Sequence, residues 1–226
     1  MNIAIIPARG GSKRILRKNI KNFIGKPIIA YSIETALASN LFDEVMVSTD
    51  DEEIAEIAIK YGAKVPFYRS EKNSNDHAST MDVIEEVLSD YSSKLNQKFD
   101  SICCIYATAP LIKVNHLIDS YAKMQKEELT CVFPSLSFSY PIWRGLEISS
   151  NEKVSLLWPE HLNSRSQDLK PVFHDAGQWY WFSVNKLYKW EWPENSQTIV
   201  LSELEAQDID NESDWKIAEM KYKLQL

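Results

Sequence analysis

The sequence predicts a three-layer α/β fold with a mostly parallel central sheet. Short apolar runs of strand type alternate with amphipathic helical patterns through the first 135 residues. This alternation is typical of strands that run parallel and are joined by helices. The most apolar run, residues 99–106, is expected to form a central strand. From residue 138 the pattern changes, which predicts an insertion in the α/β body.

The first half of the chain is expected to alternate strands with helices. We expect strands at residues 3–7, 44–48, 64–68 and 99–106, and helices at 28–37, 52–61 and 79–88. Asp50 or Asp51 can cap the second helix, which ends at Gly62. Ser79 is equally an ordinary helix cap or a ligand contact. A capping box is not expected there, because Asp82 stands where the motif has Glu.

The second half is expected to complete the sheet and end in a helix. A helix at 114–126 and strands at 130–135, 178–184 and 198–201 are expected, with a last helix at 211–223. That helix is expected to be capped by Asp210 or Asn211. It should bury Trp215, Ile217, Ala218 and Tyr222.

The insertion at about 138–178 divides what is otherwise one domain over residues 1–226. It is rich in aromatic residues, and short alternating pieces on either side of residues 149–152 predict a β-hairpin. Such a segment commonly forms a lid or a dimer contact. The Trp and Tyr content of residues 143–192 fits a buried interface and a tightly packed subdomain equally well.

Composition limits the classes of ligand that the protein is expected to bind. The chain has 226 residues and a formal net charge of -7, which disfavours nucleic-acid binding but leaves room for a small anionic ligand at a local basic site. The three cysteines form no C-x-x-C pair and are expected to be reduced core residues, which favours a cytoplasmic location. No apolar run is long enough for a membrane span.

A basic glycine loop follows the first strand. Gly10 and Gly11 allow backbone N–H groups to approach a ligand, and the nearby cations supply charge that suits a polyphosphate. These cations are Arg9, Lys13, Arg14 and Arg17. The loop matches neither common phosphate motif. The alternative is a plain turn with solvated basic residues, but the loop's place at a strand end favours ligand binding.

Asp208 and Asp210 flank an apolar residue just before the last helix. In an extended segment both carboxylates point the same way, and a divalent cation would relieve their repulsion. Oxygen ligands favour Mg²⁺, which usually takes one or two carboxylates plus phosphate oxygens. The alternative is a helix cap and a solvated Asp. Asp50 is a weaker candidate for a second metal ligand.

Two polar stretches could bind the rest of a ligand. Arg69 and residues 73–76 could hydrogen-bond a base or ribose. Residues 163–178 carry more hydrogen-bonding side chains than a turn requires, as a polar sugar would need. An acidic sugar also needs a cation, such as Arg144 or Arg165.

These residues resemble a known family. IPARGGSKRI-x-RKN, VSTDDEEIA, RSE…D-x-A-[ST]-T and QDID-x-E-x-DW look like the sugar-acid cytidylyltransferases, the CMP-sialic acid synthetase family. The match covers nearly the whole chain. FSYPI, WPE, SRSQDL and FHDAGQWYWF resemble the pseudaminic acid cytidylyltransferases more than the N-acetylneuraminate enzymes.

The resemblance implies a Rossmann-like nucleotidyltransferase fold, a homodimer, Mg²⁺ and CTP, with an acidic nine-carbon sugar as acceptor. The nucleotide-binding positions it implies are Ala8, Arg9, Gly10, Gly11, Ser12, Lys13, Lys18, Asn19, Arg69 and Ser79. The sugar-binding positions are Tyr106, Arg144, Arg165, Gln167, His174 and Gln178. Asp208 and Asp210 match the metal-binding aspartates.

The expected reaction is attack of the anomeric hydroxyl on the α-phosphorus of CTP with loss of pyrophosphate. Arg9 and Lys13 would stabilise the leaving group, and Asp210 or a metal-bound hydroxide would take the proton. The chain departs from the family at Leu16, Ala107, Trp143 and Tyr106. Tyr106 replaces a Gln of the sialic acid enzymes and argues against N-acetylneuraminate.

Alternatives stay open at this point. Within the class, the acceptor could be legionaminic acid, N-acetylneuraminate or a Kdo-like acid. Outside it, the chain could be a catalytically silent nucleotide-binding protein, against which the full set of loop cations and aspartates counts.

Overall fold

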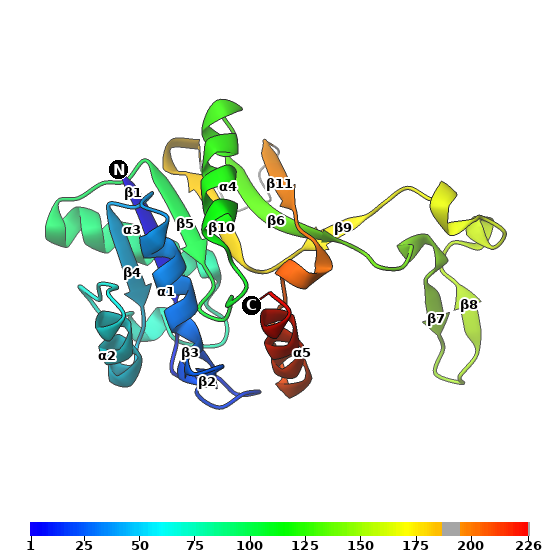
Figure 1. Cartoon of the computed structure of the whole chain (residues 1–226), viewed down its shortest axis with the longest axis horizontal. Helices are drawn as coiled ribbons and strands as arrows, with labels where there is room; N and C mark the ends of the chain where they lie inside the picture. Colours follow the sequence, from blue (N-terminus) through cyan, green and yellow to red (C-terminus); the bar gives the residue numbers. More distant parts are fainter. Residues whose placement is uncertain (187–194, 226) are drawn as a thin grey trace.

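The computed structural model describes residues 1–186 and 195–225 and centres on one mixed sheet (Figure 1). Its strands are β1 (Asn2–Pro7), β4 (Glu44–Ser48), β5 (Ser101–Ile105), β6 (Cys131–Ser137), β9 (Phe173–Asp175), β10 (Trp179–Ser183) and β11 (Ser196–Val200). The spatial order is β11-β6-β10-β5-β1-β4, with β9 also paired to β6. Only β9 and β10 of this sheet run against the other strands. The prediction of a mostly parallel sheet with a central strand near 99–106 is confirmed.

Helices cover both faces of this sheet. They are α1 (Ile28–Ala38), α2 (Glu52–Lys60), α3 (Thr80–Leu95), α4 (Val114–Lys126) and α5 (Glu212–Lys223). One apolar cluster packs α1, α2 and α4 on one face, and a second packs α3 on the other. The alternating side chains of β1 supply both clusters, which is why its sequence is an unbroken apolar run.

A third apolar cluster holds the basic loop to the C-terminal helix. Ile15 of the loop, Phe23 of the small β2 (Asn22–Phe23) and β3 (Lys26–Pro27) hairpin, and Trp215 of α5 are buried together with Ile209. Phe23 and Trp215 meet edge to face with ring centroids 5.5 Å apart. Segments nearly 200 residues apart in the sequence therefore share one anchor.

Seven short 3-10 turns connect these elements in the described part of the chain. They are Lys18–Ile20, Glu71–Asn73, Ile142–Arg144, Pro159–His161, Ser166–Asp168, Val184–Lys186 and Glu203–Glu205.

Residues 138–172, here called the arm, extend beyond the sheet past β9 (Figure 1). The arm carries the predicted hairpin, β7 (Leu146–Ile148) and β8 (Val154–Leu156). Trp143 is its centre: its ring meets Trp158 at 5.5 Å, and its Nε1 donates to a backbone carbonyl. Residues 187–192 of the aromatic-rich stretch lie outside the described residues.

Two structural expectations are wrong. Residues 64–68 form only a single bridge, between Met46 and Lys64, because Pro66 has no N–H to continue the ladder. Ile217 is 42% exposed. It lies on the opposite side of α5 from Trp215, since two residues turn a helix by about 200°.

Candidate functional site

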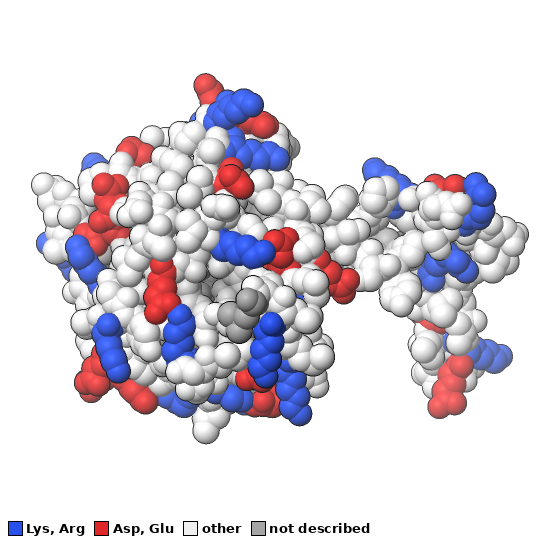
Figure 2. Space-filling view, viewed as in Figure 1, with Lys and Arg blue, Asp and Glu red and all other residues white. Residues whose placement is uncertain are grey.

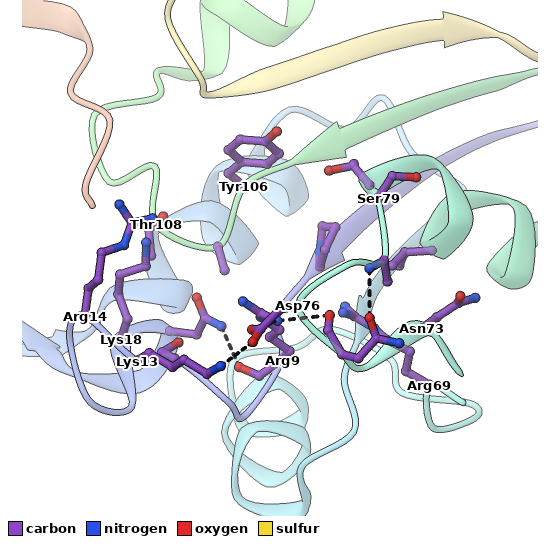
Figure 3. Close-up of a pocket in the computed structure, with 18 of the residues that line it drawn as sticks. Arg9, Lys13, Arg14, Lys18, Arg69, Asn73, Asp76, Ser79, Tyr106 and Thr108 are labelled. Atoms are coloured by element: carbon purple, nitrogen blue, oxygen red, sulfur yellow. Dashed lines mark hydrogen bonds and ion pairs between the residues drawn. The ribbon is translucent and has the colours of Figure 1, made fainter. Parts of the chain in front are cut away.

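The main cavity lies at the carboxyl ends of β1 and β5 and encloses about 530 Å³ (Figure 3). Pro7 ends β1 in its wall, and residues 106–108 follow β5. Its charged lining residues are Arg9, Lys13, Arg14, Lys18, Arg69, Asp76 and Asp210. Five cationic side chains thus face two acidic ones. This balance suits an anionic ligand in an otherwise acidic chain.

The basic loop is held in place by two aspartates that follow β4. Gly10 N donates to Asp50 Oδ1 at 2.9 Å, and Arg17 makes a two-pronged ion pair with Asp51. The Arg17 hydrogen bonds lower the pKa of Asp51, which also caps α2 as predicted. A Cβ at Gly10 would come within 2.7 Å of Asp51, so this close approach requires glycine. Asp50 supports the loop and faces its backbone.

The exposed side of the loop is paired with a carboxylate. Arg9 donates to Asp76 at 2.7 Å and Lys13 also donates to it (Figure 3). These hydrogen bonds, from Lys13 first and then Arg9, lower the pKa of Asp76. Arg9 and Lys13 converge on the two oxygens of a single carboxylate. A phosphate group could take the place of that carboxylate between the two cations.

Arg69 and Ser79 approach the cavity from the segment between β4 and α3. Arg69 is largely withdrawn from water, which lowers its pKa, and it donates to both the hydroxyl and the carbonyl of Ser48. Ser79 caps α3 in a full capping box with Asp82. The expectation that no box forms is wrong, because the Asp82 carboxylate reaches the Ser79 backbone N–H at 2.7 Å.

Asp208 and Asp210 leave the core on either side of Ile209, which is 0% exposed. Asp210 lines the main cavity, where Arg14 donates to it at 2.8 Å. Asp208 lines a neighbouring hollow of about 340 Å³ instead. Lys18 joins the two halves of the site, because its Nζ donates to the carbonyl of Ile209.

The carboxylates of Asp208 and Asp210 interact electrostatically. Withdrawal from water, and then the charge of Asp210, raise the pKa of Asp208. A divalent cation would relieve this repulsion, and oxygen donors suit Mg²⁺. The described residues contain no group of three His, Cys, Asp or Glu side chains that could hold a metal. An Mg²⁺ ion held by one or two carboxylates would take its remaining ligands from substrate phosphates and water.

The sugar-binding candidates are divided among four places. Tyr106 lines the main cavity, and His174 lines the neighbouring hollow. Gln178 is fully buried, and its Nε2 donates to Gln207 O at 3.2 Å. Arg144, Arg165 and Gln167 lie in the arm, and none of them lines either hollow.

The nucleotide-binding candidates are closer together. Arg9, Ser12, Lys13, Lys18, Asn19, Arg69 and Ser79 all line the main cavity. Ala8, Gly10 and Gly11 belong to the same loop without lining it. Sequence reasoning missed the ion pairs that Arg9 and Arg14 make across the cavity and the place of Thr108 in its wall. The rule that ligands gather at strand ends could have identified Thr108.

Comparison with known proteins decides the family. A family model described as Cytidylyltransferase matches residues 3–205. The chain belongs to the cytidylyltransferase family. Pseudaminic acid cytidylyltransferase of Campylobacter jejuni subsp. jejuni serotype O:23/36 (strain 81-176) is 45% identical over 226 residues, which cover 99% of this chain and 97% of the relative. CMP-N,N'-diacetyllegionaminic acid synthase of Legionella pneumophila is 34% identical, with 98% and 96% covered.

Solved structures agree on the fold of this cytidylyltransferase. The structure of CMP:2-keto-3-deoxy-manno-octonic acid synthetase complexed with CTP aligns with a TM-score of 0.71 at 19% identity, covering 100% of this chain and 99% of that one. The predicted family, fold class and enzyme class are confirmed.

None of the helices among the described residues is long and apolar enough to cross a bilayer. On the face shown in Figure 2, basic and acidic side chains are interspersed.

Proposed function

We propose that this cytidylyltransferase transfers CMP from CTP to the anomeric hydroxyl of a nonulosonic acid, pseudaminic acid in the first place, and releases pyrophosphate. The cavity at the strand ends carries this proposal, since five cations surround a space suited to a triphosphate. Full-length similarity to a pseudaminic acid cytidylyltransferase supports the choice of sugar.

The basic loop would bind the triphosphate. Arg9 and Lys13 would exchange the Asp76 carboxylate for phosphate oxygens, and Ser12 could donate from the same rim. Ala8, Gly10 and Gly11 would shape the loop backbone, while Lys18 and Asn19 hold it in place. Arg69 and Ser79, on the other side of the cavity, would contact the cytidine.

Asp208 and Asp210 would hold Mg²⁺, which neutralises phosphate charge when bound. The protein's own side chains would accept the proton and stabilise the developing charge. The sugar hydroxyl forms the new bond to the α-phosphorus as the bond to pyrophosphate breaks, and Asp210 takes the hydroxyl proton. Arg9 and Lys13 would stabilise the charge that develops on the pyrophosphate. Chemistry of this kind depends mainly on positioning and charge.

The arm would complete the sugar side of a partner's cavity. Its apolar surface is unusually open, with Tyr140 85% and Ile148 70% exposed. Exposed apolar area of this kind marks an interface. We propose a homodimer of one-domain subunits, residues 1–226 with an insertion at 138–178, in which Arg144, Arg165 and Gln167 reach a second copy. His174 and Tyr106 would contact the sugar from the body, whereas Gln178 is fully buried and would support the wall behind them.

The three cysteines of the chain are free and buried, which supports a cytoplasmic location for the enzyme.

Pyrophosphate release tests the proposal. The purified protein would be assayed with CTP and Mg²⁺ against pseudaminic, legionaminic, N-acetylneuraminic and Kdo acids. We expect the highest kcat/KM for pseudaminic acid. We expect no pyrophosphate release when ATP or GTP replaces CTP. Equal turnover of all four sugars would overturn the choice of sugar. No turnover of any would favour a catalytically silent nucleotide-binding protein.

A further inference from the structure

The segment that carries Asp208 and Asp210 is held in place by side chains. Residues 206–210 form neither strand nor helix between the 3-10 turn Glu203–Glu205 and α5. Each of the four consecutive carbonyl oxygens of residues 206–209 accepts a hydrogen bond from a side chain. The donors, in chain order of the carbonyls, are Lys221 at 2.8 Å, Gln178 at 3.2 Å, Gln207 at 3.0 Å and Lys18 at 2.5 Å. The course of this segment therefore depends on residues from other parts of the chain.

Two of these hydrogen bonds occupy matching positions before the two aspartates. A peptide group is planar, so a donor that holds its carbonyl oxygen also fixes the direction in which the chain enters the next residue. Lys18 holds the peptide group that leads into Asp210, and Gln178 holds the one that leads into Asp208. Lys221 holds the peptide group before that of Gln178. Gln178 is thus placed to do for Asp208 what Lys18 does for Asp210.

The turn between β9 and β10 also lies against the Asp208 side chain. Gly177 has φ +61°, in the left-handed region that favours glycine. A Cβ added to Gly177 would lie 3.5 Å from Asp208 Cγ, so the backbone of the turn comes close to the carboxyl group. Gln178 Nε2 also donates to carbonyls of its own turn, those of Ala176 and Gly177, at 3.3 and 3.4 Å. One buried side chain therefore ties this turn to the aspartate segment.

The burial of Gln178 costs free energy that the fold alone does not require. Its side chain is 0% exposed, and its Oε1 has no hydrogen-bond partner among the described residues. An apolar side chain of similar size would leave no such atom unpaired, so for folding alone it should serve about as well. Buried unpaired polar groups of this kind often accompany a functional role. The hydrogen bond into the Asp208 peptide group supplies such a role.

We propose that Gln178 and Lys221 are positioning residues for Asp208, which hold its carboxylate at the hollow beside the main cavity. This inference rests on the proposed function, in which Asp208 and Asp210 hold Mg²⁺, and it adds the side chains that set the place of Asp208. Because Gln178 is completely buried, it acts on the reaction only through its neighbours. Replacing a residue that orients a metal-binding group typically costs roughly ten- to a hundred-fold in metal affinity or activity.

Steady-state kinetics of the full-length enzyme with CTP, Mg²⁺ and pseudaminic acid test the role of Gln178. Gln178→Met keeps the approximate volume of the side chain and removes its donor. We expect kcat to fall about ten-fold and the Mg²⁺ concentration for half-maximal activity to rise, while the KM for CTP stays unchanged. The melting temperature should change little. A purely structural role predicts instead a large fall in melting temperature and equal changes in the KM for both substrates, which would overturn the inference.

Lys221 provides a second, independent variant. Lys221→Met should also lower kcat, but by less, since its hydrogen bond lies one peptide group further from Asp208. Lys221→Arg can still donate to the Ala206 carbonyl and should keep most of the activity. Lys223→Met is the matched control, because Lys223 is an exposed residue of α5 that lines neither hollow. A higher KM for the sugar at unchanged kcat in Lys221→Met would make this lysine a direct sugar contact and overturn its positioning role.

A crystal structure of ligand-free Gln178→Met gives a readout that is independent of metal and turnover. We expect the Asp208 carboxyl group to be displaced by about 1 Å or more relative to the wild-type protein, a shift large enough to impair catalysis. The Asp210 carboxyl group should stay in place, because Lys18 still holds the peptide group before it. An unmoved Asp208 would overturn the inference.

A double-mutant cycle asks whether Gln178 acts through Asp208. In an Asp208→Asn background, Gln178→Met should lower kcat no further. Full additivity of the two changes, or an unchanged kcat in Gln178→Met alone, would contradict the proposal. Failure of the proposed function is separable, because it would appear as wild-type protein without turnover, whereas the crystal structures would still show whether Asp208 moves.

Discussion

The basic loop and the arm were both expected to contact substrate, yet the structure holds them in different ways. Loop side chains bind partners far along the sequence: Arg9 pairs with Asp76, and Arg14 with Asp210. In the arm, Arg165 pairs with Asp168 three residues away. The loop that we propose to bind the nucleotide is thus assembled within one chain, whereas the arm residues proposed to bind the sugar are presented outward.

Burial shows the same contrast. Ile15 anchors the loop in the apolar cluster with Ile209, whereas Tyr140 and Ile148 of the arm stay largely open. On the view in Figure 2, a narrow neck joins the arm to the body. One half of the proposed site is complete in a single copy, and the other half would be completed by the proposed second copy.

The largest effect is expected inside the body. Asp210→Asn should lower kcat by at least ~10²-fold, because it removes the carboxylate placed at the reacting centre. Steady-state kinetics with CTP and the sugar would measure this. Glu212→Gln is the matched control, since Glu212 pairs with Lys21 outside the cavity and should leave kcat unchanged. A loss below tenfold in Asp210→Asn would contradict the assignment.

Asp76→Ala should strengthen CTP binding. The carboxylate pairs with the two cations that we propose to bind the triphosphate, so its removal would free both of them. We expect Kd for CTP, measured by calorimetry, to fall roughly three- to five-fold. Asp90→Ala, which removes a partly exposed pair with Lys94 on α3, serves as control. Weaker binding in Asp76→Ala would instead give Asp76 a direct role with the bound nucleotide.

The ion pair of Glu205 tests how the segment that leads to Asp208 and Asp210 is anchored to the body. The pKa of Glu205 is lowered to about 2, first by the hydrogen bond from Lys113, the residue before α4. Because the pKa is lowered on folding, the stabilisation is present above the ordinary value of 4.5 and is lost as pH falls toward 2.

Glu205→Gln should therefore lower Tm at pH 7 by roughly 2–4 °C. Thermal unfolding of both proteins from pH 7 to pH 3 would show this difference shrink below pH 4. A difference that does not depend on pH would mean that the ion pair is not its source.

Leu16→Pro should give the smallest effect. Leu16 is 81% exposed in a loop already fixed by Arg17 and Asn19. Proline would further restrict the loop in the ligand-free protein. This should lower KM for CTP about two-fold, because less conformational entropy would be lost on binding. Leu16→Ala controls for loss of the side chain. No change would show that the surrounding structure already holds the loop, and a rise would show that proline distorts it.

Local patterns predicted most of the fold and part of the site. The alternation of apolar runs predicted the sheet and its covering helices, and a strand end located the basic loop. The two aspartates were predicted from their spacing just before the last helix. What the patterns could not give are contacts between distant segments. The Arg9–Asp76 pair joins residues 67 apart, and Lys18 meets Ile209 across 191.

Two local errors have simple physical causes. Pro66 ended an expected strand, because a ladder needs the N–H that proline lacks. Asp82 completed a capping box despite its shorter side chain.

A mixed dimer tests the division of the site between two copies most directly. One subunit would carry Arg165→Ala and the other Asp210→Asn, co-expressed with different tags and purified through both. Each parent should be poorly active, Arg165→Ala by roughly 30-fold or more for loss of a charge partner. If the arm serves the partner's cavity, one cavity of the mixed dimer is intact, and about half of the wild-type activity should return. A mixed dimer as inactive as its parents would contradict the account.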